Sequence, residues 1–109
     1  MKVLNFYIGE FVDDKANHYG KYVNKDGAVY VGQWKDDMQE GHGEEYFTDG
    51  TRYEGNYENG QRHGRGKFNW PDGSAYDGDF FKNDIEGYGT YKWRDGRVYQ
   101  GDWRSNQMN

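Results

Sequence analysis

The stretch KFNWPDGSAYDGDF, residues 67–80, contains the pattern that decides the fold. Aromatic residues alternate with polar ones on both sides of an Asp-Gly pair. Residues two apart in a strand lie on the same face, so Tyr76, Gly78 and Phe80 share one side. An Asp-Gly pair between two such runs favours a tight turn, because glycine adopts positive φ without steric cost. The stretch therefore predicts an antiparallel β-hairpin with one aromatic face.

The same pattern returns every 23 residues, which indicates a tandem array. Each copy begins with a tyrosine: Tyr7, Tyr30, Tyr53, Tyr76 and Tyr99. Each copy also carries an Asp-Gly turn, whose glycines are Gly27, Gly50, Gly73 and Gly96. The turn aspartates are expected to accept hydrogen bonds from nearby backbone amides. The chain is thus predicted to be one array with units 7–29, 30–52, 53–75 and 76–98, a partial fifth unit 99–109, and a lead-in 1–6.

We predict an all-β protein, an elongated and twisted single-layer antiparallel meander in which each unit is one hairpin. At a strand spacing of ~4.8 Å, four and a half units would span about 40–45 Å. The glycine on each strand weakens strand propensity, and we expect a ring from a neighbouring strand to lie over its bare backbone. The second link of each unit, such as residues 58–66, is longer and carries glycine at its exit. It predicts a wider hairpin loop.

Composition excludes several classes of protein. The net charge of −5 over 109 residues disfavours nucleic-acid binding. Because cysteine is absent, disulfides, zinc–thiolate sites and cysteine nucleophiles are excluded. No apolar run approaches the ~20 residues of a membrane span. The apolar start of the chain carries the first in-register Tyr7 and runs into Glu10 and Asp13, so we interpret it as mature structure.

The repeated unit reads Tyr-x-Gly-x-aromatic, then Gly-x-Gly-x-aromatic, then Asp-Gly, and residues 53–80 show it most completely. This unit closely resembles the MORN (membrane occupation and recognition nexus) repeat, and the resemblance covers residues 7–103. Some positions depart from the family pattern. His18 stands where other units have glycine, and Glu45 takes an aromatic place, so we expect the face of the second unit to shift or open there. The family's usual glycine is kept at Gly60 and replaced at Asp14, Asp37, Asn83 and Asn106.

The resemblance implies a scaffold. Proteins with such repeats include radial spoke components, junctophilins, plant phosphatidylinositol phosphate kinases, a SET-domain lysine methyltransferase and partners of unconventional myosins. It also implies a cytoplasmic location, in a cytoskeletal or ciliary assembly or at the cytosolic face of a membrane.

The first functional hypothesis is a non-catalytic scaffold whose aromatic and glycine face binds a protein partner, either a helix or an extended segment. Self-association through an open sheet edge is a further route to a complex. The predicted partner-binding residues are Tyr30, Trp34, Tyr53, Tyr57, Phe68, Trp70, Tyr76, Phe80, Tyr91, Trp93, Tyr99 and Trp103.

Two alternatives remain open. One is a phosphoinositide or membrane-surface module, although the net negative charge opposes it. Its candidate residues are Arg62, Arg65, Lys67, Lys92, Arg94 and Arg97. The other is a regulatory piece of a larger lipid kinase or methyltransferase.

Catalytic chemistry finds little support in the sequence. The three histidines, His18, His42 and His63, occupy three different places in the unit, so we expect loop histidines in water. Asp77 and Asp79 share a face, which we interpret as a solvated outer surface. We therefore predict no catalytic residue, no metal and no cofactor.

Overall fold

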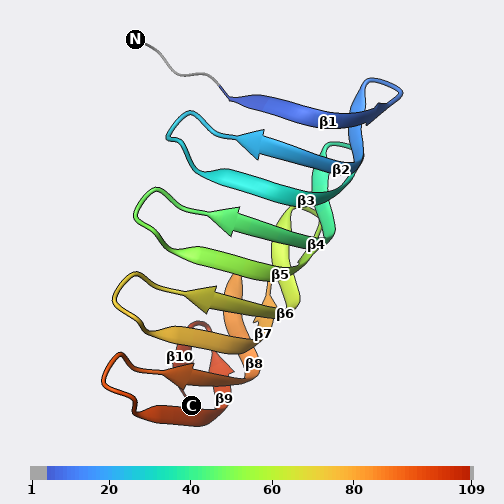
Figure 1. Ribbon diagram of the computed structural model, residues 1–109. Helices are drawn as coiled ribbons and strands as arrows, with labels where there is room; N and C mark the ends of the chain where they lie inside the picture. The colour runs from blue at the N-terminus through green and yellow to red at the C-terminus, as the bar shows by residue number, and fades with distance from the viewer. Residues whose placement is uncertain (1–4, 109) are drawn as a thin grey trace.

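The structure, a computed structural model, describes residues 5–108 as strands and turns (Figure 1). The strands are β1 (Phe6–Val12), β2 (Lys15–Val23), β3 (Val29–Lys35), β4 (Met38–Tyr46), β5 (Arg52–Glu58), β6 (Gln61–Asn69), β7 (Ala75–Phe81), β8 (Asp84–Lys92), β9 (Val98–Arg104) and β10 (Gln107–Met108). All ten form one antiparallel sheet in chain order, which confirms the predicted all-β meander. The molecule measures 46 × 30 × 18 Å, so it is elongated as predicted. Of the predicted lead-in, residues 1–4 lie outside the described residues.

The Asp-Gly links form three-residue hairpin loops. In the first, Gly27 N donates to Asn24 O and Asn24 N donates to Ala28 O, both at 3.0 Å. Gly27 has φ of 97°, and the equivalent glycines of the other units have 95–96°. A turn followed by a residue with positive φ is a common hairpin geometry, and glycine occupies that place at little cost. The turn aspartates accept local amide hydrogen bonds as expected, for example Asp49 from Thr51 N at 2.8 Å.

The second link of each unit is a tight two-residue turn, so the predicted wide loop is wrong. Strand β3 ends at Lys35 and β4 begins at Met38, with only Asp36 and Asp37 between them. Both turn residues have positive φ, 48° and 71°. Asp and Asn enter this region more readily than other non-glycine residues, so glycine is not required. The glycine that suggested a loop, Gly41, lies within β4 with φ of 78°.

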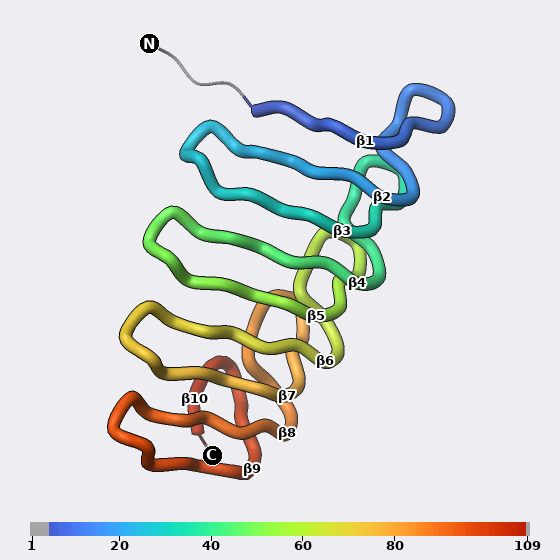
Figure 2. The backbone as a smooth tube through the Cα atoms, in the orientation of Figure 1, coloured from blue at the N-terminus to red at the C-terminus, as the bar shows by residue number. Residues whose placement is uncertain are grey.

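A bulge bends the first strand of each of the first four units. The register between β3 and β4 shifts between Gly32 and Trp34, and the same shift recurs between Gly55 and Tyr57 and at the equivalent places in β1 and β7. A bulge bends its strand and increases its twist. Figure 2 shows the consequence: the end of each hairpin that carries the two-residue turn bends away from the rest of the hairpin. From the second unit on, each two-residue turn also forms a backbone hydrogen bond with the preceding unit. In the second unit, Asp37 N donates to the carbonyl of Ala16 at 2.9 Å.

A column of paired glycines runs across the sheet under the repeat tyrosines. Its members are Gly9, Gly20, Gly32, Gly43, Gly55, Gly66, Gly78, Gly89 and Gly101. A Cβ on Gly55 would lie 2.6 Å from Tyr53 Oη, and one on Gly66 would lie 2.6 Å from a carbon of the same ring. The expectation that rings cover bare backbone is therefore confirmed. Every repeat tyrosine also donates its hydroxyl hydrogen to the carbonyl three residues on, at 2.7–2.9 Å.

The core is a zigzag of rings that we call the ring ladder. Along the array, consecutive rings meet edge to face at centroid distances of 5.0–5.6 Å. The order is Tyr7, Trp34, Tyr30, Tyr57, Tyr53, Phe80, Tyr76, Trp103 and Tyr99. Such contacts contribute about 0.5–1.5 kcal/mol each beyond the apolar area they bury. The ladder therefore joins each unit to the next.

Candidate functional site

Seven of the predicted partner-binding residues are core residues. The exposed fraction of each is 8% or less, and Tyr53 and Tyr76 are fully buried. The seven are Tyr30, Trp34, Tyr53, Tyr57, Tyr76, Phe80 and Trp103. In this structure the seven rings fill the core and offer almost no surface to a partner. The reason is the packing across the bend of the sheet, where the second ring of each unit fits between its own tyrosine and the tyrosine of the preceding unit.

The remaining five predicted residues are only partly buried. They are Phe68, Trp70, Tyr91, Trp93 and Tyr99. Phe68 and Trp70 stack with centroids 5.4 Å apart and planes 10° apart. Trp70 contacts Tyr91 at 5.7 Å, and Tyr91 contacts Trp93 at 4.9 Å. The first four rings come from β6, β8 and the residues that follow each strand, next to the Asp-Gly loops, whereas Tyr99 lies on β9.

The prediction missed Phe47, which extends this surface. Its ring stacks on Phe68 at 6.2 Å with planes 25° apart. Phe47 holds the place in its unit that Trp70 and Trp93 hold in theirs, so the repeat register could have identified it. We call the five partly buried rings that follow one another in contact the outer ring row: Phe47, Phe68, Trp70, Tyr91 and Trp93.

An ion pair closes the place where the second unit lacks a ring. Glu45 Oε1 accepts hydrogen bonds from Arg62 Nη1 at 2.7 Å and from the Tyr57 hydroxyl at 2.6 Å. The Arg62 guanidinium lies 5.3 Å from the Phe68 ring centroid and 5.7 Å from that of Tyr53. Burial, followed by the charge of Glu45, raises the pKa of Tyr57 far above its ordinary value of 10. The expected shift or opening of this face is therefore wrong, because a charged pair fills the gap and the strand register continues through it.

The predicted lipid-binding residues do not form one cluster. Arg62 lies among the rings, whereas Arg65 lies on the opposite face, 3.5 Å from Asp77 and 3.7 Å from Asp79. Lys67 and Lys92 line a shallow hollow on that opposite face. Arg97 Nε lies 2.8 Å from Asp95 Oδ2, and its guanidinium covers the Trp93 ring at 5.4 Å. Arg94 follows Trp93, beside the fourth Asp-Gly loop.

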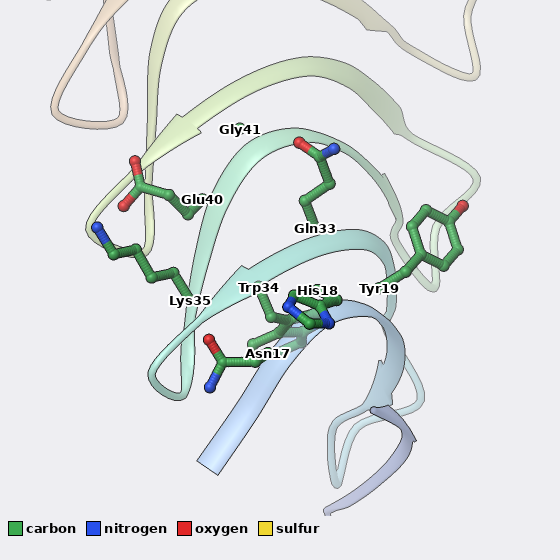
Figure 3. A pocket seen from close by; sticks show the side chains of 8 residues that line it. All are labelled: Asn17, His18, Tyr19, Gln33, Trp34, Lys35, Glu40 and Gly41. Atoms are coloured by element: carbon green, nitrogen blue, oxygen red, sulfur yellow. The ribbon is translucent and has the colours of Figure 1, made fainter. Parts of the chain in front are cut away.

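A second hollow lies between the first and second units (Figure 3). Its lining comes from β2, β3 and β4, including His18, Gln33 and Trp34. Its polar groups already serve the backbone: Gln33 Oε1 accepts from His42 N at 2.9 Å, and Asn17 Oδ1 accepts from Asp36 N at 3.2 Å. We therefore interpret this hollow as a structural contact between units.

Asp77 and Asp79, which share a face of β7, are engaged in similar contacts. Asp79 Oδ2 accepts from Tyr88 N at 3.1 Å, and both Asp77 and Asp79 contact Arg65. Ser74 is buried, and its hydroxyl donates to Asp72 Oδ1 at 2.6 Å within the turn. These contacts give the acidic residues and the serine structural partners.

The repeated hairpin, the glycine column and the ring ladder define an open tandem β-hairpin repeat protein. A family model described as the MORN repeat matches residues 7–29, 30–52, 53–75, 76–96 and 99–109. The chain therefore belongs to the MORN repeat family. MORN repeats are generally non-catalytic modules for protein or membrane interactions. None of the curated proteins compared with the chain matches it. Between residues 5 and 108, no helix has the length and apolarity to cross a membrane.

Proposed function

We propose that this chain is a non-catalytic scaffold that holds a segment of a protein partner along the outer ring row. The observation that carries the proposal is the unbroken contact of five partly exposed rings over three units. We further propose that the scaffold works in the cytoplasm, in a cytoskeletal or ciliary assembly, as it does in some proteins with such repeats.

The outer ring row has the physical properties of a binding surface. Tyr, Trp and Phe provide a large contact area, and their packed rings have little rotamer freedom left to lose on binding. A single-layer sheet has no second layer to cover apolar side chains on this face. Since the buried ladder is a separate set of rings, the outer row can contact a partner without disturbing the core.

Charge beside the row favours a partner with basic residues. Each outer tryptophan, and Phe47, is followed two residues later by a turn aspartate. Backbone hydrogen bonding by Thr51 holds the pKa of Asp49 below its usual range, and hydrogen bonds from the Ser74 side chain and backbone do the same for Asp72. The loops after Phe47 and Trp70 therefore carry negative charge at neutral pH, whereas Arg94 and Arg97 outweigh Asp95 in the loop after Trp93. A helix or extended segment with apolar anchors and flanking Lys or Arg complements this surface.

The four tryptophans provide the test, because two belong to the row and two to the core. Amphipathic segments selected from a peptide display library against the folded chain should shift the indole signals of Trp70 and Trp93, and leave those of Trp34 and Trp103 unchanged. The W70A/W93A variant should bind at least about tenfold more weakly, in line with loss of interface anchors. The matched control Tyr88→Ala, which removes an exposed ring from the opposite face, should bind within about twofold of the wild type.

Three outcomes would contradict the proposal. One is peptides that bind equally well to the W70A/W93A variant. Another is salt-sensitive pelleting with phosphoinositide vesicles that substitution of Lys67 and Lys92 abolishes, which would favour the membrane alternative. The third is light scattering that shows a dimer in which the row is already covered, which would favour self-association.

A further inference from the structure

The junction between the second and third units brings together three metal-ligating side chains. His42 and Glu44 lie on β4, two residues apart and therefore on the same face. Glu54 on β5 is the direct cross-strand partner of Glu44. One donor atom from each residue can be chosen so that all three lie within 4.8 Å of one another. His42 Nε2 is 3.5 Å from Glu54 Oε2.

The other histidines show what distinguishes this cluster. All three lie in strands, so the expectation of loop histidines is wrong. His18 lies 3.7 Å from Glu10, and His63 lies 3.6 Å from Glu58. Within residues 5–108, only His42 belongs to a group of three or more such donors. In this described part, the histidines thus form one three-donor group and two pairs that lack the second carboxylate.

The repeat provides the same backbone arrangement at other junctions with different side chains. The corresponding residues are Tyr19, Lys21 and Val31 between units one and two, Arg65, Lys67 and Asp77 between units three and four, and Tyr88, Thr90 and Gln100 between units four and five. None of these sets offers two carboxylates and an imidazole. The donor set is therefore specific to one junction of an otherwise repeated scaffold.

The charges around the site leave an electrostatic reason for a cation. Two carboxylates directly opposite each other in a sheet repel one another. Arg52 lies 3.7 Å from Glu44 Oε2, and the Tyr46 hydroxyl donates to the same oxygen. Both contacts use Oε2 and leave Oε1 of Glu44 for a cation. Lys67 is the cross-strand partner of Glu54 on its other side and compensates part of that charge.

We propose that His42, Glu44 and Glu54 bind one divalent transition-metal cation on the face opposite the outer ring row. An imidazole nitrogen and two carboxylate oxygens suit Zn²⁺ and its neighbours better than Mg²⁺ or Ca²⁺, which prefer oxygen alone. With bonds of 2.0–2.2 Å, tetrahedral donors lie about 3.3 Å apart, so side-chain rotation is sufficient to close the site. The His42 and Glu54 side chains, which are 58% and 48% exposed, are free to rotate in this way. The cation joins β4 to β5 and so clamps two repeat units together.

Titration of the full chain with ZnCl₂ in a calorimeter tests the proposal, with a chelator competition to fix the affinity. One Zn²⁺ per chain is expected. His42→Ala, Glu44→Gln and Glu54→Gln should each weaken binding by at least about tenfold, as loss of a ligand or its support does. The matched controls His18→Ala and His63→Ala should bind within about twofold of the wild type.

Thermal unfolding gives a second readout, because a ligand that binds only the folded state raises Tm. Zn²⁺ should raise the Tm of the wild type and of the His18→Ala and His63→Ala variants, and leave that of His42→Ala unchanged. Circular dichroism without metal checks that each variant is folded, which the exposure of these side chains favours. Absence of saturable binding, equal losses in the His18→Ala or His63→Ala variants, or Mg²⁺ binding as tight as Zn²⁺ binding would overturn the proposal.

Discussion

The ring ladder and the outer ring row use the same residue types, repeat with the same period and lie on one face of the sheet. Between its end rings, Tyr7 and Tyr99, the ladder is buried, whereas the row is partly exposed. A ladder ring such as Tyr53 contacts rings of its own unit and of the next across the bend of the sheet. A row ring such as Trp70 lies beside the Asp-Gly loops, where the bend does not enclose it. The bulge, and not residue type, therefore separates core from surface in this array.

The largest expected difference between the two regions is in stability. Tyr53→Ala removes a fully buried ring and its hydrogen bond to the Asn56 carbonyl, so we expect a loss of about 3–5 kcal/mol. Trp70→Ala removes a partly exposed ring and should cost about 1 kcal/mol. Urea unfolding of both variants measures the contrast. Equal losses would show that the two regions are one core.

Alkaline pH should lower the stability of the protein through the ring ladder, because its buried tyrosines resist ionisation. Burial raises the pKa of Tyr76 to about 12 and those of Tyr30, Tyr53 and Tyr57 further. A raised pKa means that folding favours the neutral hydroxyl, so this stability is intact below the unfolded value of about 10 and is lost as pH rises above it. Tm measured from pH 8 to 12 should fall steeply above pH 10, and a flat profile would contradict the buried hydroxyls.

The glycines beneath each region give a finer comparison. A Cβ on Gly66 would press on the Tyr53 ring, which is pinned by its own hydrogen bond, so Gly66→Ala should cost about 1–3 kcal/mol. Gly73 has open space around it but φ of 95°, so Gly73→Val should cost at least about 1 kcal/mol through backbone strain alone. Thermal melts of the two variants, followed by far-ultraviolet circular dichroism, compare steric and backbone effects. An unchanged Tm for either variant would contradict its assigned cause.

The smallest effect is expected where the two regions meet. Glu45→Gln weakens the pair with Arg62 and the hydrogen bond from Tyr57, both partly shielded from water, so we expect a loss of about 1–2 kcal/mol. Glu44→Gln, next to it on the opposite face, should change stability by less than about 0.5 kcal/mol. Chemical denaturation without added metal tests both. A larger loss of stability for Glu44→Gln than for Glu45→Gln would contradict the account, because the stabilising ion pair would then be that of Glu44 on the opposite face.

The sequence predicted the meander, the residues that share each aromatic face and the rings over glycine, because the 23-residue period fixes which residues share a face. The sequence-based prediction failed where the same residues suit either a tight turn or a wider loop. Asp36-Asp37 forms a tight turn although neither residue is glycine, and Gly41 marks a twisted strand position that the sequence suggested was a loop. The bulge at Gln33 leaves no signal in the alternation, so the burial of Trp34 could not be separated from the exposure of Trp70.

The most direct test is the solvent exposure of the four tryptophans in the chain labelled with 5-fluorotryptophan. Exchange from H₂O to D₂O shifts the ¹⁹F signal of an indole that water reaches. The account predicts clear shifts for Trp70 and Trp93 and none for Trp34 and Trp103, with single Trp→Phe variants to assign the signals. Four equal shifts, or shifts at Trp34 and Trp103 alone, would contradict a buried ladder beside an accessible row.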